Sequence, residues 1–394
     1  MRVRLLDLSE QYRALEKEIR AAADEVLASQ RFILGPKLKE FENAAAQYCG
    51  APHAIGVSSG TDALLAVFMT LEIGLGDAVI TTDYSFFATG GCIARTGATP
   101  VFIDIEPDTY NMSASALRSY IEKRCQTVDG KLVNESRQLI RALVPAHLFG
   151  LCCEMTQIAA IAHEHNLVLI EDAAQAMGAE FPGELGPAKA GTMSDAGCFS
   201  FYPSKNLGAA GDAGLIVCQH DEFAERLRVC RQHGMEARYE HQFIGGNFRM
   251  DELQAAILKV KLPHLDRWSA ARREAAKFYT NELERAGLQR KIDLPVEPYA
   301  KRGLTNHHIY HQYVIRTQKR DELRLHLADR EIETAIYYPL ALHEQPCFEY
   351  LGYKPGDFPE AERAARETLA LPIYPEIPRE AQQYVVNCIA EFFG

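Results

Sequence analysis

The sequence lacks any apolar run of the roughly eighteen residues that a membrane-spanning helix needs. The acidic residue Asp7 interrupts the N-terminal sequence before an apolar stretch as long as that of a signal peptide is reached. We therefore expect no export. An excess of basic residues is also missing, because the formal net charge is −11, whereas proteins that bind phosphate backbones are rich in Lys and Arg. These absences predict a cytoplasmic protein that binds neither membranes nor nucleic acid.

Paired C-x-x-C motifs are absent, although the chain has ten cysteines. The cysteines are scattered and include the adjacent Cys152 and Cys153, which fits neither a zinc site nor a disulfide framework. We expect most of them to be small buried side chains. The triplet His163-Glu164-His165 lacks the i, i+4 histidine spacing of zinc proteases. No metal site is predicted.

The 394 residues show no internal repeat, low-complexity tract or flexible linker, so we expect one or two closely packed domains. From residue 54 to 217, short apolar runs alternate with small-residue turns and amphipathic stretches, as in a βαβ sheet. The predicted strands include residues 78–81, 99–103, 139–144 and 167–170. In such sheets ligands bind beyond the carboxyl ends of the strands.

Three segments are predicted along the chain. Residues 1–30 contain a helix over 10–27 and are expected to pack with the small domain. Residues 31–261 form a large domain, and residues 262–394 a smaller α+β domain that begins near a helix weakened at Pro263. In the small domain we expect strands over 313–316 and 334–337 and a late helix over 360–370.

The first candidate site follows an apolar strand that ends in Ser58-Ser59-Gly60-Thr61-Asp62 and leads into an Ala/Leu-rich helix. Free N–H groups and the helix dipole at such a start can bind a phosphate, and Gly60 permits close approach. An ordinary N-capping turn is the alternative.

The second candidate is Asp172, which an apolar strand places at its carboxyl end, before two alanines and Gln175. A carboxylate fixed against a pyridinium nitrogen keeps that ring protonated, as an electron-sink cofactor requires. A magnesium ligand or a helix cap would explain the same pattern.

The third candidate is Lys205, which lies among aromatic and small residues in the uncharged stretch 197–208. Desolvation there lowers the pKa of the lysine and makes its amine available as a Schiff-base former. A solvated surface lysine is the alternative. The nearby Gly208, Gly211 and Gly214 precede a strand instead of opening a helix, which excludes a dinucleotide-binding fingerprint.

These segments together resemble the DegT/StrS group of pyridoxal-phosphate (PLP)-dependent nucleotide-sugar aminotransferases, which have aminotransferase fold type I. The resemblance covers essentially the whole chain, and its matching segments are residues 32–36, 59–64, 86–89, 171–175, 200–205 and 247–256. It implies an α/β fold: a PLP-binding large domain with a mostly parallel central sheet covered by helices, plus a smaller C-terminal α+β domain.

The resemblance also implies roles for single residues. Lys205 would hold PLP as a Schiff base and move the proton at the substrate carbon. The other cofactor contacts would be made by Asp172 to the pyridinium nitrogen, Gln175 near the phenolic oxygen, Gly60, Thr61 and Ser200 to the phosphate, and Phe86 to the ring face. Phe86 could equally be an ordinary core phenylalanine. Asn247 would reach the phosphate in the neighbouring subunit, which implies a homodimer.

The implied reaction takes an amino group from an amino acid, by family expectation L-glutamate, and transfers it to an oxo-sugar nucleotide. Family members that aminate C3 are favoured over those that aminate C4, while amination of a cyclitol, another PLP reaction and a non-catalytic sugar-nucleotide-responsive regulator remain alternatives. A dehydrating relative has His in place of Lys205, so the lysine favours aminotransfer. The candidate substrate contacts are Arg231, His308, Tyr337 and His343. Tyr337 stands where some relatives have His.

Overall fold

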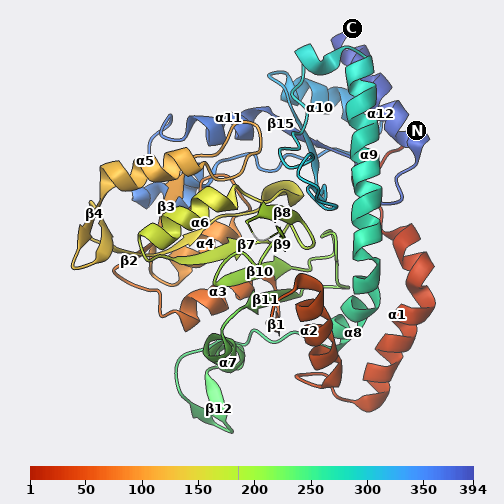
Figure 1. Ribbon diagram of the computed structural model, residues 1–394. Helices are drawn as coiled ribbons and strands as arrows, with labels where there is room; N and C mark the ends of the chain where they lie inside the picture. The colour runs from red at the N-terminus through yellow and green to blue at the C-terminus, as the bar shows by residue number, and fades with distance from the viewer. Residues whose placement is uncertain (185) are drawn as a thin grey trace.

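The computed structural model describes residues 1–184 and 186–394, and a long helix connects its two domains. This helix, α9 (Leu265–Arg285), runs along one side of the molecule from the large domain to the small one (Figure 1). The two chain termini lie near each other at the small-domain end.

A nine-stranded sheet forms the centre of the large domain. Its main path has the order β1-β11-β10-β7-β6-β2-β3, in which pairing is parallel from β10 to β3 and antiparallel on both sides of β11. The strands are β1 (His53–Val57), β2 (Asp77–Thr82), β3 (Thr99–Ile103), β4 (Cys125–Val128), β5 (Lys131–Asn134), β6 (Leu139–Val144), β7 (Val168–Asp172), β10 (Ala196–Ser200) and β11 (Gly214–Cys218). The mostly parallel sheet predicted from the sequence is confirmed.

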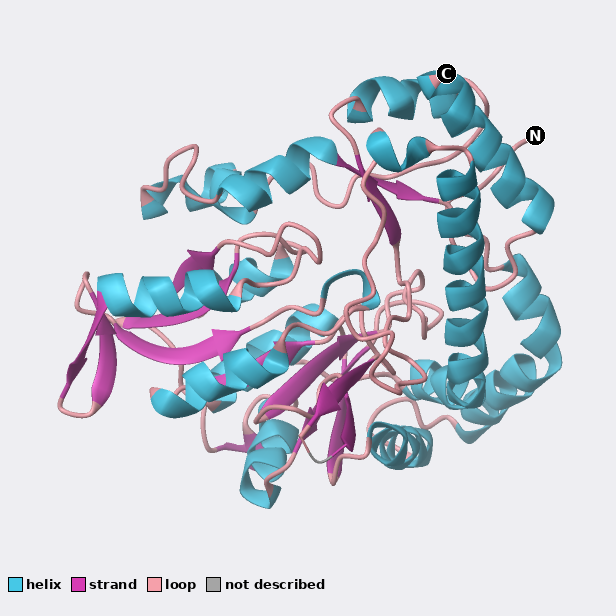
Figure 2. Cartoon of the chain, turned by 45° about the horizontal axis from the view of Figure 1, so that its top comes forward, coloured by secondary structure: helices cyan, strands magenta, loops and turns pink. Residues whose placement is uncertain are grey.

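Helices cover both faces of this sheet (Figure 2), because successive strand residues point to opposite sides and both sides are apolar. Leu143 belongs to one buried cluster and Val144 to the other. The first face is covered by α2 (Pro36–Cys49), α5 (Ala114–Arg124), α6 (Met155–Glu164) and α8 (Glu252–Lys261), and the second by α3 (Gly60–Thr70), α4 (Ala88–Arg95) and α7 (Asp221–Cys230). Two small hairpins are β8 (Glu180–Gly183) with β9 (Gly186–Lys189) and β12 (Met235–Ala237) with β13 (Glu240–His241).

The small domain is built around an antiparallel strand pair. Its elements are β14 (Tyr313–Arg316), α10 (Arg320–Ala328), α11 (Pro359–Glu367), β15 (Thr368–Leu371) and α12 (Arg379–Phe393). Two sequence predictions are corrected here. Residues 334–337 form no strand, since only Ala335 bridges Ala370, and the helix expected over 360–370 ends at Glu367 because the next four residues pair with β14.

The N-terminal segment divides between the two domains. Val3 bridges Ile332 of the small domain, whereas α1 (Ser9–Ser29) packs on α8 and places Leu15 in the large-domain core. The expectation that all of residues 1–30 pack with the small domain is therefore wrong for the helix. The predicted division at residue 262 falls in the short 3₁₀ turn Leu262–His264 between α8 and α9, and we retain it as a proposal.

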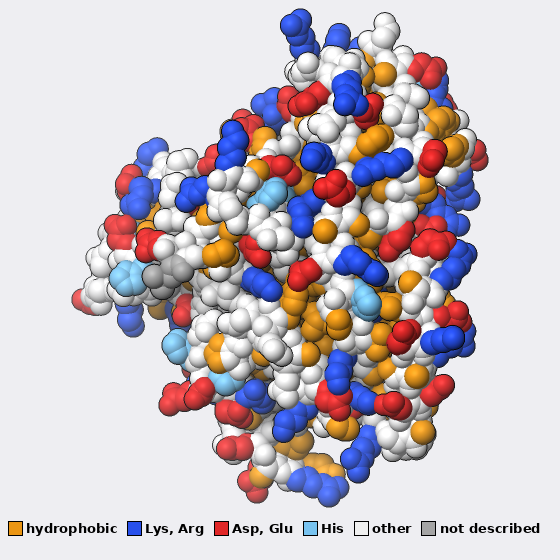
Figure 3. Space-filling model, turned by 45° about the vertical axis from the view of Figure 1, so that its right-hand side comes forward, with side chains coloured by type: hydrophobic (Ala, Val, Ile, Leu, Met, Phe, Trp, Pro, Cys, Tyr) orange, Lys and Arg blue, Asp and Glu red, His pale blue; other side chains and the backbone are white. Residues whose placement is uncertain are grey.

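Charged side chains of both signs are mixed on one face of the molecule (Figure 3). On the face shown in Figure 3, acidic and basic side chains alternate and do not separate into fields of one sign. All ten cysteines are free thiols, and eight of them are buried, as the sequence led us to expect. No helix among the described residues has the length and apolar character needed to cross a membrane.

Candidate active site

A cavity of about 550 Å³ opens where the parallel strands of the sheet end. The segments that follow β1, β2, β6, β7 and β10 all reach its wall, because these strands run in the same direction. Residues that the sequence predicted as site residues meet here: Gly60, Thr61, Phe86, Asp172, Gln175, Ser200, Lys205 and Tyr337. The cavity is in the size range of small-molecule sites.

The N-terminus of α3 forms one wall of the cavity. Ser59 caps the helix, since its hydroxyl oxygen accepts a hydrogen bond from the Asp62 amide at 3.0 Å. Gly60 and Thr61 are the first two helical residues, so their N–H groups have no acceptor within the helix. A Cβ atom on Gly60 would lie 2.7 Å from the Cβ of Ser200, which explains the glycine. The two amides, the Ser200 hydroxyl and the helix dipole fit a phosphate group.

Asp172 is the last residue of β7, and its carboxylate is held in place by two donors. The Thr89 hydroxyl donates to Oδ2 at 2.7 Å, and the Ala174 amide donates to Oδ1 at 3.2 Å. Turns follow Asp172, which excludes the helix-cap alternative. Across residues 1–184 and 186–394, no group of three or more His, Cys, Asp or Glu side chains is arranged to hold a metal ion.

Lys205 lies in a compact loop after β10. The loop is closed by the Lys205 amide, which donates to the Tyr202 carbonyl at 2.8 Å, and by the buried Lys261 ammonium, which donates to the Gly208 carbonyl. Burial lowers the pKa of the Lys205 amine to about 8, and the nearby Asp172 carboxylate only partly opposes this effect. Lys205 is therefore a desolvated amine that faces the cavity and not a solvated surface lysine.

Phe86 and Gln175 occupy different parts of the cavity wall. Phe86 is 53% exposed, so it is not a core phenylalanine, and its ring centre lies 6.1 Å from that of Tyr338. The Gln175 Oε1 accepts from the Phe149 amide at 2.8 Å, and its Nε2 donates to the Tyr338 hydroxyl at 3.0 Å. The second hydrogen on Nε2 remains for an acceptor in the cavity.

Sequence reasoning missed the buried pair that supports the end of β7. His147 accepts from the Cys153 amide through Nδ1, so its Nε2 carries the hydrogen and donates to Glu171 at 2.7 Å. The same carboxylate accepts from the amides of Gly191 and Met193. His147 follows β6, and the rule that sites lie at strand ends could have identified it.

His311 is a second residue that was missed. Its Nδ1 lies 3.1 Å from the Asn206 Oδ1, an atom that only accepts, so Nδ1 carries the hydrogen and Nε2 is left as an acceptor. Burial, together with the positive charge of Lys205, lowers the pKa of His311 well below its usual range. A neutral imidazole thus lines the cavity beside the lysine.

Three predicted substrate contacts lie outside this cavity. Arg231 is buried and pairs with Glu42, and its guanidinium also donates to the Gly56 carbonyl at 2.9 Å. The His308 ring stacks on Tyr310 at 3.9 Å, and burial lowers its pKa to about 3. These two expectations are corrected, because both side chains are engaged inside the protein fold.

His343 is the third of these residues. Its Nδ1 lies 2.6 Å from Asp83, and its side chain is only 3% exposed. The expected substrate contact is corrected here too, since the ring is enclosed between the domains. Of the four candidates, only Tyr337 lines the cavity.

Asn247 lies on the surface, away from the cavity that contains Lys205. Its backbone forms an antiparallel bridge with Gln232. Its side chain borders a second cavity of about 600 Å³ together with Asp62 and Arg95. The role of Asn247 in a neighbouring subunit stays a prediction.

The groups around the main cavity fit PLP. Amides and a hydroxyl suit its phosphate, the Asp172 carboxylate suits its ring nitrogen, the Lys205 amine suits its aldehyde carbon, and Phe86 offers an aromatic face. The three chemically different ends of one cofactor thus have matching partners in a single cavity.

Comparison with known proteins gives the same assignment. The model of the DegT/DnrJ/EryC1/StrS aminotransferase family matches residues 13–390. The chain is 48% identical over 393 residues to the pleiotropic regulatory protein of Geobacillus stearothermophilus, covering 100% of this chain and 99% of that protein. It is 38% identical over 391 residues to dTDP-3-amino-3,4,6-trideoxy-alpha-D-glucose transaminase of Streptomyces venezuelae, covering 99% and 96%.

Solved structures agree with the sequence matches. The crystal structure of S. venezuelae DesV in complex with a ketimine intermediate superposes with a TM-score of 0.89 at 38% identity, covering 99% of this chain and 98% of that one. NtdA of Bacillus subtilis, with bound cofactor PMP, superposes with a TM-score of 0.83 at 27% identity, covering 98% and 82%. The chain belongs to the DegT/DnrJ/EryC1/StrS aminotransferase family and is a PLP-dependent sugar aminotransferase.

Proposed function

We propose that this enzyme transfers the amino group of L-glutamate to C3 of an oxo-sugar carried by a nucleotide, with 2-oxoglutarate as the second product. The main support for the proposal is that the desolvated amine of Lys205 and the carboxylate of Asp172 line the same cavity. The choice of C3 is supported by the similarity to the S. venezuelae 3-amino-sugar transaminase over nearly the whole chain.

Each residue at the cavity has a proposed task. Bound PLP supplies an electron sink for the negative charge that develops at the substrate carbon. Asp172 keeps the ring nitrogen protonated, while Gly60, Thr61 and Ser200 bind the phosphate. The Lys205 amine takes up the proton at the substrate carbon and returns it, which requires a neutral amine at working pH.

The walls around these groups orient the reactants. Phe86 would offer its aromatic face to the ring of bound PLP, and Gln175 would donate the hydrogen of Nε2 that Tyr338 does not take to an acceptor on the cofactor. Tyr337 and Tyr338 line the cavity, and we place the acceptor sugar against them. These residues act by binding and by excluding water, which strengthens the electrostatic contacts inside the cavity.

We also propose that the enzyme is a homodimer in which Asn247 serves the site of the neighbouring subunit. The exposed position of Asn247 supports this, since its side chain does not line the cavity of its own chain. Apolar side chains are exposed near it in sequence and space: Ile244 is 87% exposed, and Ile33, which bridges Asp251, is 46% exposed. An interface between two copies would bury them.

The test is a panel of oxo-sugar nucleotides offered to the PLP-loaded enzyme with L-glutamate. A 3-oxo-sugar nucleotide should yield a 3-amino product and an equal amount of 2-oxoglutarate. If only a 4-oxo-sugar or a cyclitol is aminated, the assignment to C3 is wrong, but the protein is still an aminotransferase. A panel offered with alternative amino acids distinguishes L-glutamate from other donors.

A regulatory function is the second candidate, because the 48% identical relative is called a pleiotropic regulatory protein. A regulator without catalysis needs neither a desolvated lysine nor a fixed carboxylate in its cavity. The same panel separates the two functions: a protein that binds sugar nucleotides with no 2-oxoglutarate formed from any amino acid and any acceptor would be a regulator.

A further inference from the structure

The segment Tyr337–His343 carries two residues of the cavity wall and is anchored at both of its ends. Tyr337 and Tyr338, at its start, line the cavity. Leu342 and His343, at its end, do not line it and are buried between the domains. The anchors are two consecutive residues after β2, Asp83 and Tyr84.

Tyr84 holds the start of the segment. Its hydroxyl lies 2.6 Å from the Tyr337 carbonyl and accepts a hydrogen bond from the Tyr338 amide at 2.7 Å. A third contact, at 2.9 Å, joins it to the Thr368 hydroxyl of β15. Tyr84 is itself 1% exposed, so its ring is enclosed by its neighbours.

Asp83 holds the end of the segment through both backbone and side chain. Its carbonyl accepts from the Leu342 amide at 2.8 Å, and its Oδ1 accepts from the His343 amide at 2.9 Å. Its Oδ2 lies 2.6 Å from the His343 Nδ1. Asp83 is fully buried, and a buried carboxylate is tolerated only when donors compensate it, so aspartate and histidine fix one another.

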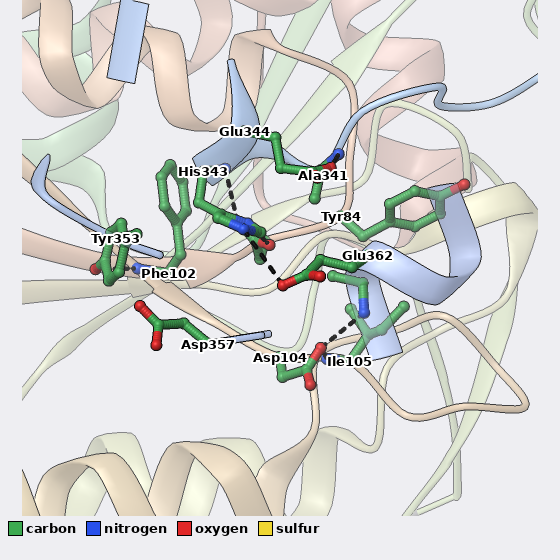
Figure 4. Close-up of polar contacts among 12 residues, drawn as sticks. Tyr84, Phe102, Asp104, Ile105, Ala341, His343, Glu344, Tyr353, Asp357 and Glu362 are labelled. Atoms are coloured by element: carbon green, nitrogen blue, oxygen red, sulfur yellow. Dashed lines mark hydrogen bonds and ion pairs between the residues drawn. The ribbon is translucent and has the colours of Figure 1, made fainter. Parts of the chain in front are cut away.

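The far side of the His343 ring is also enclosed. Its Nε2 faces the Glu362 carboxylate of α11 at 3.6 Å, as Figure 4 shows, and the Phe358 ring centre lies 4.9 Å away. Apolar side chains of both domains surround the contact, with Phe102 from β3 and Leu342 in the same cluster. The imidazole thus lies between Asp83, which follows β2 of the large domain, and Glu362 in α11 of the small one.

The anchors Asp83 and Tyr84 are also close in sequence to Phe86, the residue proposed to face the cofactor ring. Phe86 lies three residues after Asp83, and its ring centre lies 6.1 Å from that of Tyr338 in the cavity wall. Displacement of the segment would therefore move Tyr338 relative to Phe86.

We propose that His343 is a positioning residue, which acts through Asp83 to hold Tyr337 and Tyr338 in place as the wall that binds the acceptor sugar. This inference rests on one part of the proposed function, the binding of an acceptor sugar against Tyr337 and Tyr338. His343 touches neither cofactor nor substrate, and it affects the reaction through the placement of the two tyrosines.

The test compares His343→Ala with His343→Asn in the PLP-loaded enzyme. Loss of the side-chain hydrogen bond to Asp83 should raise the KM for the oxo-sugar nucleotide and the Kd of the amino-sugar nucleotide product by about tenfold in His343→Ala, although the backbone amides of Leu342 and His343 still bind Asp83. His343→Asn, whose amide nitrogen stands close to the position of Nδ1, should restore most of the affinity. Cofactor absorbance and the rate of the half-reaction with glutamate should stay within about twofold of wild type.

Two further variants are measured in the same way, Tyr84→Phe as a second test and His308→Leu as a control. Tyr84→Phe removes only the hydroxyl at the other anchor and should raise the same KM, which keeps the inference testable if His343→Ala folds poorly. His308→Leu changes a buried histidine outside the cavity and should leave the KM unchanged. Equal KM and Kd values in wild type, His343→Ala and Tyr84→Phe would overturn the inference, whereas a wild-type protein that binds no sugar nucleotide would overturn the proposed function itself.

Discussion

The Thr89 hydroxyl donates a hydrogen bond to Asp172 at 2.7 Å, so a residue of α4 fixes the carboxylate at the end of β7. The backbone of Asp172 is held as well, because its carbonyl accepts from the His147 amide at 3.0 Å. The position of this charge is therefore set by the fold before any ligand binds.

Asp172→Asn should lower kcat for aminotransfer on the order of 100-fold or more, because the neutral amide no longer keeps the ring nitrogen protonated. Thr89→Val should lower kcat by about tenfold through loss of one hydrogen bond to a charged group. Steady-state kinetics with L-glutamate measure both. Thr96→Val is the matched control at the other end of α4, and a loss in that variant equal to that of Thr89→Val would contradict this explanation.

The pKa of Lys205 predicts how fast the cofactor-free protein takes up PLP at different pH values. Only the neutral amine attacks an aldehyde, and burial lowers the pKa of this amine from 10.5 to about 8. The rate of uptake should therefore rise with pH and level off above about 9. A rate of uptake that still increases steeply near pH 10 would show that burial does not lower the pKa of the Lys205 amine.

Asp172→Asn provides an internal check of this pH dependence. The Asp172 carboxylate raises the pKa of the amine and so opposes the effect of burial. Its replacement should move the midpoint of PLP uptake to lower pH, and a midpoint that moves to higher pH would show that the two groups do not interact in this way.

The proposed exchange of Asn247 between subunits is tested by mixing two inactive variants. In a heterodimer of Lys205→Ala and Asn247→Ala, one of the two sites combines an intact Lys205 with an intact Asn247 if Asn247 serves the neighbouring chain. Activity should then reappear at about one quarter of the wild-type level at random mixing, since half of the dimers have one good site. Mixtures as inactive as the separate variants would place Asn247 in the site of its own chain.

Arg231→Met should destabilise the protein and leave substrate affinity unchanged. The substitution leaves the Glu42 carboxylate buried without its partner, at a cost of about 3 kcal/mol in the free energy of unfolding. Urea unfolding measures this change, and Arg238→Met is the control at an exposed arginine of the same segment. A raised KM with unchanged stability would restore the original hypothesis that Arg231 contacts substrate.

Local sequence patterns predicted strands of the central sheet, and most of the residues expected to contact the cofactor line one cavity. The runs at residues 78–81, 99–103 and 139–144 are apolar enough to be strands buried on both faces, and all three are strands of the central sheet. The resemblance to the family placed Lys205 and Asp172 at one site, and the structure gives the physical reason, since β7 and β10 are parallel and end at the same edge of the sheet.

Contacts between distant residues could not be read from such patterns. The helix expected over 360–370 ends early because β15 pairs with β14, about fifty residues earlier in the chain. Arg231 and His343 resemble substrate contacts in sequence, but their partners are Glu42 and Asp83, which are 189 and 260 residues away. The role of a single basic residue can be assigned only when the acidic residue that it pairs with is known.

The most direct test of the account is the visible spectrum of the PLP-loaded enzyme before and after addition of L-glutamate, followed by an oxo-sugar nucleotide. Glutamate should convert the band of the lysine-bound cofactor to that of its amino form with release of 2-oxoglutarate, and the sugar should restore the first band. Lys205→Ala should show neither change. A wild-type spectrum that responds to neither glutamate nor any other amino acid would contradict an aminotransferase.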